Sequence, residues 1–182
     1  MRWSREFFET PCAGSPVATE IDREMARADG GSAPGETNTT ADDVGTGSVT
    51  APANVPPTNS AASLEAWLAT GEYKSWVCEA TTHPARAGSG HTRNRICSNP
   101  TLSSATGTGE YPIGAAGVKE LIDGAGAITG YAVYVKKQPG AGEGWFWYER
   151  VGSSTYANGL GVSLCVGCHS GAPRDSVFTH VK

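Results

Sequence analysis

Two segments in the second half of the chain alternate bulky side chains with the period of a β-strand. Residues 129–137 read TGYAVYVKK, residues 144–150 read GWFWYER, and the loop QPGAGEG between them suits a hairpin. Successive strand residues point to opposite faces. Both segments carry large side chains on each of the two faces, as Trp147 and Tyr148 show. The pair therefore predicts antiparallel strands in a sheet that must be covered on both faces.

Other segments complete a mainly β (α+β) fold class with an antiparallel sheet and few short helices. Residues 116–122, AGVKELI, form a third strand candidate. A helix is expected through LEAWLAT, with Ser63 as its N-cap and Gly71 closing it. The stretch 75–110 is polar and is interpreted as loop. The sequence thus predicts aromatic-rich strands with little helix.

The amino-terminal part has a different composition. Residues 28–60 are dense in Gly, Pro, Ser, Thr and Ala and have almost no large apolar side chain, so they cannot offset their ordering entropy. We therefore divide the chain into a low-complexity, largely disordered tether, 1–60, and one domain, 61–182, with a short helix expected in 16–29. Residues 61–182 carry ten basic and nine acidic side chains, which excludes a basic stripe for nucleic acid.

The pentapeptide CVGCH at residues 165–169 is the attachment pattern of a c-type haem. Two thiols three positions apart, Cys165 and Cys168, can add to the two vinyl groups of one haem. His169 then lies over the iron as an axial ligand. The sequence therefore predicts one covalent haem c, which also becomes one cover for the aromatic sheet.

Two other interpretations of the same residues remain open. A zinc site could use both thiolates and His169, but a structural zinc needs four ligands and His180 is the nearby candidate. A redox Cys-x-x-Cys pair is the other alternative. Neither explains the histidine directly after the second cysteine as simply as haem does.

Cys78 and Cys97 bracket a polar loop and are expected to form a disulfide. Haem c attachment implies an oxidising compartment, where such a bond persists. A metal site that includes His83 and His91 is the alternative. The disulfide and the haem are linked expectations, because both place the protein in the periplasm or outside the cell.

The export route is not visible in this sequence. The first residues, MRWSREFFETPCAGS, lack the apolar stretch of a secretory signal. Export then implies a processed chain or an earlier start, unless the haem interpretation is wrong. The residues before Cys12, Glu9-Thr10-Pro11, do not match a lipoprotein signal. An unpaired thiol is therefore a simpler interpretation of Cys12 than a lipid anchor.

The order of motifs in 61–182 resembles the cytochrome P-460 family. The resemblance rests on YPIGAAGVKEL at 111–121, the strand GWFWYER, CVGCH, and RDSVFT at 174–179. It is strongest from residue 110 onward. The loop between Cys78 and Cys97 departs from the family pattern, so the chain resembles a divergent member.

The resemblance implies a periplasmic, mainly antiparallel β protein, often a homodimer, with a five-coordinate c-type haem. Some members carry a covalent bond between a lysine and the porphyrin and oxidise hydroxylamine. Related β-form cytochromes c′ lack that bond and bind nitric oxide or carbon monoxide. Lys119 falls on the position of the cross-linking lysine, and His169 on that of the proximal ligand.

Lys119 and Asp175 each keep a simpler alternative. Taken from the residues alone, Lys119 could point to solvent between buried neighbours. Asp175 could relay protons beside an open iron site, or it could pair with Arg174 and order the chain end. We treat Lys119 and Asp175 as candidate catalytic residues.

The expected function is that of a periplasmic mono-haem c-type cytochrome with an open axial site. It would oxidise hydroxylamine through a lysine-cross-linked haem and pass electrons to a soluble electron-transfer protein. The alternatives are a non-enzymatic haem protein for nitric oxide binding or electron transfer, and a disulfide-stapled secreted module with zinc or no cofactor.

Overall fold

The computed structural model describes residues 54–182. Cys12, the helix expected in 16–29 and most of the tether predicted for 1–60 lie outside this range. The first helix begins at Ala61, and Val55 before it already packs against the buried core.

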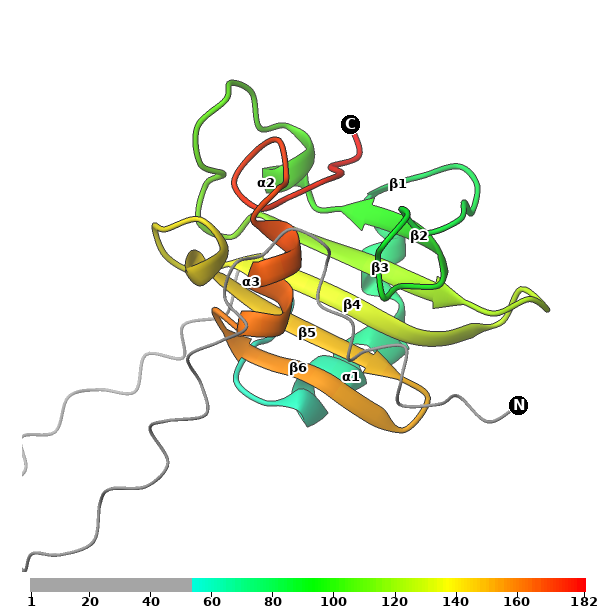
Figure 1. Ribbon diagram of the computed structural model, residues 1–182. Coiled ribbons are helices and arrows are strands. Elements are labelled where there is room, and N and C mark those ends of the chain that lie inside the picture. The colour runs from blue at the N-terminus through cyan, green and yellow to red at the C-terminus, as the bar shows by residue number, and fades with distance from the viewer. Residues whose placement is uncertain (1–53) are drawn as a thin grey trace, which may run out of the picture.

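A single six-stranded antiparallel sheet forms the centre of the protein (Figure 1). Its strand order follows the sequence, so each strand pairs with the one before it. The mainly antiparallel fold class with few short helices is confirmed. The strands are β1 (Val77–Cys78), β2 (Arg93–Ser98), β3 (Ala116–Ile122), β4 (Ile128–Lys136), β5 (Trp145–Val151) and β6 (Ser154–Leu160).

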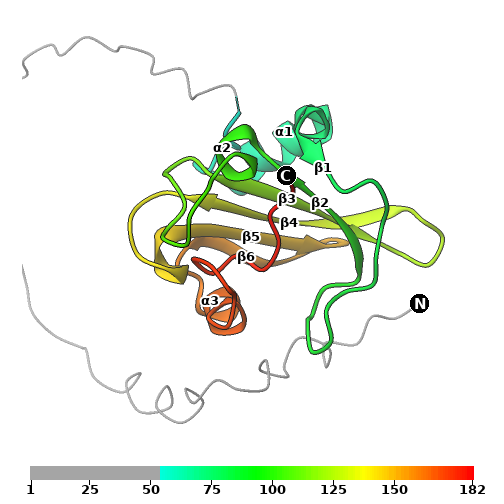
Figure 2. The same ribbon diagram turned by 90° about the horizontal axis from the view of Figure 1, so that it is seen from above.

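Helices lie on both sides of this sheet. Helix α1 (Ala61–Thr70) packs on one face, which we name the α1 face, and α3 (Ser163–His169) lies on the opposite one, the α3 face (Figure 2). The remaining helical elements are short: α2 (Pro100–Ser103), and the 3-10 turns η3 (Glu72–Ser75) and η4 (Gly142–Gly144). The sheet is therefore the middle layer.

The predicted alternation of β4 and β5 decides what each face contains. Val133, Val135, Phe146 and Tyr148 belong to one buried cluster with the α1 residues Leu64 and Leu68. The other alternating set packs in a second buried cluster with Cys165 of α3; from β4 and β5 it contains Tyr134, Trp145 and Trp147. The expectation that both faces need cover is confirmed.

Helix α1 begins one turn earlier than predicted. Ser60, not Ser63, is the N-cap, because its side-chain oxygen accepts from the Ser63 N–H at 3.1 Å. Two alanines, strong helix formers, follow Ser60 and let the helix start there. Gly71 ends the helix with φ 72°, as expected.

The interpretation of 75–110 as loop is wrong for two elements. It contains β2, whose sequence RNRICS has only two apolar side chains, and the short helix α2. Pairing with β3 along six residues stabilises β2, and such pairing is invisible in local composition. β6 was also not predicted, because STYANGL is polar and small.

The disulfide between Cys78 and Cys97 is confirmed. The two residues lie directly opposite each other in the β1–β2 register. The bond joins the short first strand to the sheet and closes the loop between them.

We predict that the free energy of unfolding of the Cys78→Ala/Cys97→Ala double variant is about 3 kcal/mol lower than that of the wild type. Without the bond the unfolded chain gains the conformational entropy of an open loop of this length. Urea unfolding followed by tryptophan fluorescence measures the change. Val77→Ala, at the exposed neighbour in β1, is the control and should change the value much less. Equal stability of the double variant and the wild type would contradict the prediction.

Candidate functional site

Helix α3 carries the whole CVGCH motif. Cys165, Cys168 and His169 stand at positions i, i+3 and i+4, so they share one face of the helix. The helix approaches η4 so closely that a Cβ on Gly142 would lie 2.9 Å from a methyl of Val166. Glycine is therefore required at that position, and the hairpin loop before β5 fixes the height of α3 above the sheet.

The first cysteine of the motif has a buried side chain. Cys165 is a free thiol in the cluster on the α3 face. Burial, and secondarily the charge of Glu149, raises its pKa to about 12. Since thiolates are the reactive form, Cys165 has to become more exposed to solvent before it can form a thioether.

His169 is held in one tautomer. Its Nδ1 lies 2.7 Å from the carbonyl oxygen of Ser176, and because a carbonyl can only accept, Nδ1 carries the proton and Nε2 keeps the lone pair. The ring packs against Trp147 and Phe178, with centroids 4.6 and 5.5 Å away. A backbone acceptor on one ring nitrogen is the usual support of a metal-binding histidine.

The pKa of His169 is lowered to about 4. Burial is the main cause, and the positive charges of Lys119, His91 and Arg86 add to it, while the bond to Ser176 opposes them. His169 is therefore neutral at neutral pH, the form that can ligate a metal.

A small pocket brings Lys119 and His169 together. It lies between β3 and α3 and has a volume of about 20 Å³, about the space of one water molecule. Lys119 therefore lines this pocket on the α3 face and is only partly exposed to solvent. The lining residues are Ile96, Lys119, Tyr134, His169, Ser176, Val177, Phe178 and Thr179.

The surroundings of Lys119 disfavour its charged form. Burial lowers the pKa of its amine to about 8, and the charge of Arg86 adds to this, whereas Glu149 and Glu79 oppose it. A part of the amine is consequently neutral near physiological pH, which makes Lys119 more nucleophilic than an exposed lysine.

Sequence reasoning missed Glu149 as a site residue. In the sheet register Lys119 is opposite Ala132, and Ala132 is opposite Glu149. The two charges thus lie in one row on the α3 face, separated by a small side chain. Glu149 is only 6% exposed, and His91 Nδ1 lies 3.2 Å from its Oε1. The available signal was a glutamate that alternates in phase with Trp145 and Trp147.

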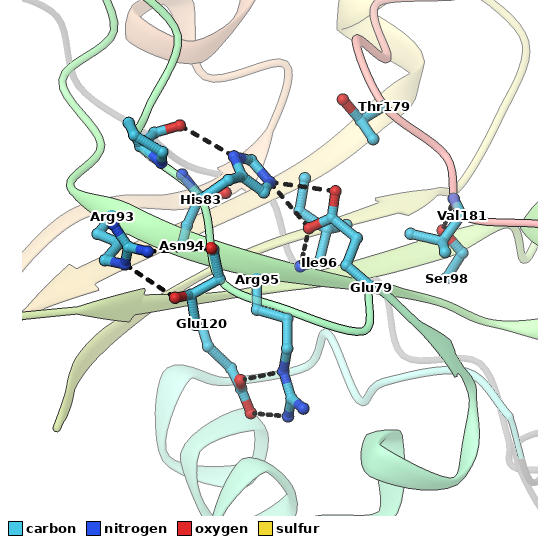
Figure 3. A network of polar contacts seen from close by, with 12 residues as sticks. Glu79, His83, Arg93, Asn94, Arg95, Ile96, Ser98, Glu120, Thr179 and Val181 are labelled. Atoms are coloured by element: carbon cyan, nitrogen blue, oxygen red, sulfur yellow. Dashed lines mark hydrogen bonds and ion pairs between the residues drawn. The ribbon is translucent and has the colours of Figure 1, made fainter. Parts of the chain in front are cut away.

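The loop between β1 and β2 is anchored to β2, on the side of Lys119 away from Glu149. His83 Nε2 lies 2.9 Å from Glu79 Oε2, and the same oxygen accepts from the Ile96 N–H at 2.8 Å (Figure 3). His83 and His91 therefore have separate acidic partners. The alternative metal site on these two histidines is not what the structure assembles.

Asp175 does not line the pocket with Lys119 and His169. Its Oδ1 lies 2.9 Å from Lys136 Nζ, and its Oδ2 accepts from the Tyr111 N–H at 2.8 Å. The alternative pairing with Arg174 is wrong, because the Arg174 guanidinium instead donates to backbone carbonyls, including that of Gly109 at 2.7 Å. Of the predicted site residues, the structure thus brings Lys119 and His169 to one pocket and places Asp175 outside it.

The described residues, 54–182, contain no cluster of three or more His, Cys, Asp or Glu side chains suited to a metal ion. His180, the fourth ligand considered for zinc, lies with its Nδ1 2.9 Å from the Tyr111 hydroxyl. The ligand set for structural zinc is therefore not assembled in this part of the chain.

The donor set fits a c-type haem, whereas the packed pocket is too small for one. Two sulfurs and a correctly protonated histidine on one helix face are the groups that haem c needs. A porphyrin is far larger than the pocket, so binding must displace side chains that fill the α3 face. Phe178 is one of them; its ring lines the pocket and lies 3.6 Å from the Arg86 guanidinium.

No protein-family model, curated protein or solved structure matches this chain. The resemblance to the cytochrome P-460 family consequently rests on the motifs alone. Within residues 54–182 no helix is both long and apolar enough to span a bilayer.

We predict that Lys119→Met raises the free energy of unfolding of the haem-free protein by ~1–2 kcal/mol at pH 7, because a partly buried ammonium is removed. The pKa is about 8 in the folded protein and 10.5 ordinarily, so the unfolded chain binds more protons between these values. Wild-type stability therefore rises across that interval, and the advantage of the variant shrinks.

Urea unfolding at pH 7 and pH 9.5 measures both effects. Lys137→Met, at an exposed position directly after β4, is the control. Its free energy of unfolding should stay within about 0.5 kcal/mol of the wild-type value. A destabilised Lys119→Met at pH 7 would show that the amine makes favourable contacts instead.

Proposed function

We propose that the domain of residues 61–182 carries one c-type haem, attached through Cys165 and Cys168 with His169 as axial ligand. The observation that carries this is the state of His169: its Nδ1 proton is held by a carbonyl, and its ring lines the pocket that Lys119 also lines. The Cys78–Cys97 disulfide supports a periplasmic or extracellular location, where haem c is attached.

The substrate that we propose is hydroxylamine. The haem, when bound, would supply an iron that accepts electrons from a small nitrogen compound at its open face, and a soluble electron-transfer protein would remove them. The support is the pairing of a motif histidine with a largely buried lysine, the residue that cross-links the haem in the family the sequence resembles. A homodimer belongs to the same resemblance.

The lysine bond requires an oxidant. Lys119 Nζ would form this link by exchanging one hydrogen on the amine and one on a porphyrin carbon for a nitrogen–carbon bond, so two electrons and two protons would have to leave. Hydrogen peroxide, a two-electron oxidant, can accept them and become water. The lowered pKa of Lys119 supports this step, because the neutral amine is the nucleophile.

Oxidation of hydroxylamine also releases protons, which a base near the site must accept. Both carboxylate oxygens of Asp175 already hold donors, so Asp175 is poorly placed for this role. Glu149 is buried in the row of Lys119 and is paired with His91. We therefore assign proton transfer to Glu149 and His91, which connect the row to the loop between β1 and β2.

Two other functions use particular observations. Without the Lys119 bond the same site would bind nitric oxide or transfer electrons without catalysis. The Cys78–Cys97 disulfide is also what the third candidate requires, a disulfide-stapled secreted module with zinc or no cofactor. The haem content of the mature protein separates this last candidate from the others.

We predict that protein produced in a host with cytochrome c maturation gives a pyridine haemochrome spectrum with one haem per chain. Cys165→Ala/Cys168→Ala should lose covalent haem completely, because no thiol remains to add to the vinyl groups. Colourless wild-type protein from such a host would contradict the proposal.

We predict that tryptic digestion after peroxide treatment yields a haem peptide that contains both CVGCH and the segment around Lys119. Lys119→Arg should release the haem with CVGCH alone and should lose hydroxylamine-dependent reduction of an added soluble cytochrome. Lys137→Arg is the control and should keep the joined peptide. A haem peptide without the Lys119 segment in the wild type would leave nitric oxide binding as the function.

A further inference from the structure

The orientation of His169 depends on a turn that two residues hold in an unusual conformation. Asp175 and Ser176 have φ values of 43° and 62°, and they are the only non-glycine residues of the described range with positive φ. The turn closes through the Val177 N–H, which donates to the Arg174 carbonyl at 2.8 Å. Positive φ at both central residues is the geometry of a type I′ turn, which favours glycine.

The product of this turn is the Ser176 carbonyl that accepts from His169 Nδ1. With ordinary negative φ values at Asp175 and Ser176 the peptide group after Ser176 would point elsewhere, and the ring would lose this acceptor. The carbonyl is therefore available to His169 only while the turn keeps a conformation that its own residues disfavour.

The restraint on the turn comes from the side chain of Asp175. One oxygen pairs with Lys136 and the other accepts from the Tyr111 N–H, so the carboxylate joins the turn to β4 and to the segment before β3. The Asp175 and Lys136 side chains are each 1% exposed. A buried pair that uses both carboxylate oxygens resists rotation of the residue that carries it.

Lys136 is itself fixed by other partners. Its ammonium donates to the Gly140 carbonyl at 3.0 Å and lies 3.1 Å from Glu110 Oε2, and it stands over the Trp145 ring at 5.4 Å. The anchor of the turn is thus a cation held from several sides within the sheet, and it does not move with the chain end.

We propose that Asp175 is a positioning residue for His169: through Lys136 and the strained turn it fixes the Ser176 carbonyl and so sets the tautomer and electron density of the imidazole. The inference rests on the proposed function for its haem-loaded consequence, whereas its effect on the tautomer holds in the haem-free protein. A histidine that donates through Nδ1 is a more basic ligand, which stabilises the ferric state.

Asp175→Asn tests this role in the full-length chain. The variant keeps an acceptor for Tyr111 but loses the charge that binds Lys136, so the turn should relax. Nitrogen-15 spectra of the haem-free protein should change from one dominant Nδ1–H tautomer of His169 to a mixture. The haem-loaded protein should show a more positive reduction potential and a lower iron–histidine stretching frequency.

Glu110→Gln is the matched control, because Glu110 contacts the same lysine from the exposed side and does not touch the turn. It should leave the tautomer, the potential and the stretching frequency unchanged. Asp175→Asn/Ser176→Gly should restore the Nδ1–H tautomer, since glycine adopts positive φ without an anchor. If Asp175→Asn does not fold, Lys136→Gln/Asp175→Asn replaces it, because that pair leaves no buried charge unpaired.

The inference is overturned if Asp175→Asn folds and its His169 keeps the same Nδ1–H tautomer as in the Glu110→Gln control. If the tautomer changes as expected but no variant binds haem, the positioning role stands and the proposed function fails. If haem binds and the tautomer does not respond to Asp175, the proposed function stands and the inference fails.

Discussion

The structure depends on a sheet that is bulky on both faces. Strands β4 and β5 place aromatic rings in both alternating sets, so the sheet is stable only between two layers of other side chains. The α1 face meets this need with a helix and apolar contacts. The α3 face is covered by the short helix α3 and by the chain end, in which Val177 is buried and Phe178 packs against His169, and the candidate site lies there.

The α3 face combines close packing with buried charge. Lys119 and Glu149 occupy the same row of the sheet in which Tyr134 and Trp147 supply neighbouring rings. Burying ionisable groups costs stability unless they are paired. Lys119 and Glu149 therefore cost stability at the face for which the haem site is proposed.

The residues RDSVFT, which follow CVGCH in the sequence, surround His169 and hold its turn in the structure. Asp175 joins the turn to Lys136, Ser176 presents its carbonyl to His169, and Phe178 packs against the same ring. The candidate axial ligand is therefore supported by residues that follow it closely in the chain. The packed state seen here has no room for a porphyrin, so under the proposed function haem attachment would have to precede the docking of α3 on the sheet.

The sequence alone determined the strands β3, β4 and β5, the faces of their residues and the Cys78–Cys97 pair, because strand period and cysteine content are local properties. It also indicated His169 as a ligand through its place in CVGCH. It did not indicate β2 or β6, since their stability comes from hydrogen bonds to neighbouring strands and not from their own polar composition.

Only the tertiary structure decided which site residues meet. Lys119 of β3 and His169 of α3 line one pocket, and Glu149 lies in the row of Lys119 across Ala132. Asp175, adjacent to the motif in sequence, is directed away to Lys136 by a turn with positive φ. Sequence proximity could not show this, because the direction of a side chain after a turn is set by the partner that holds it.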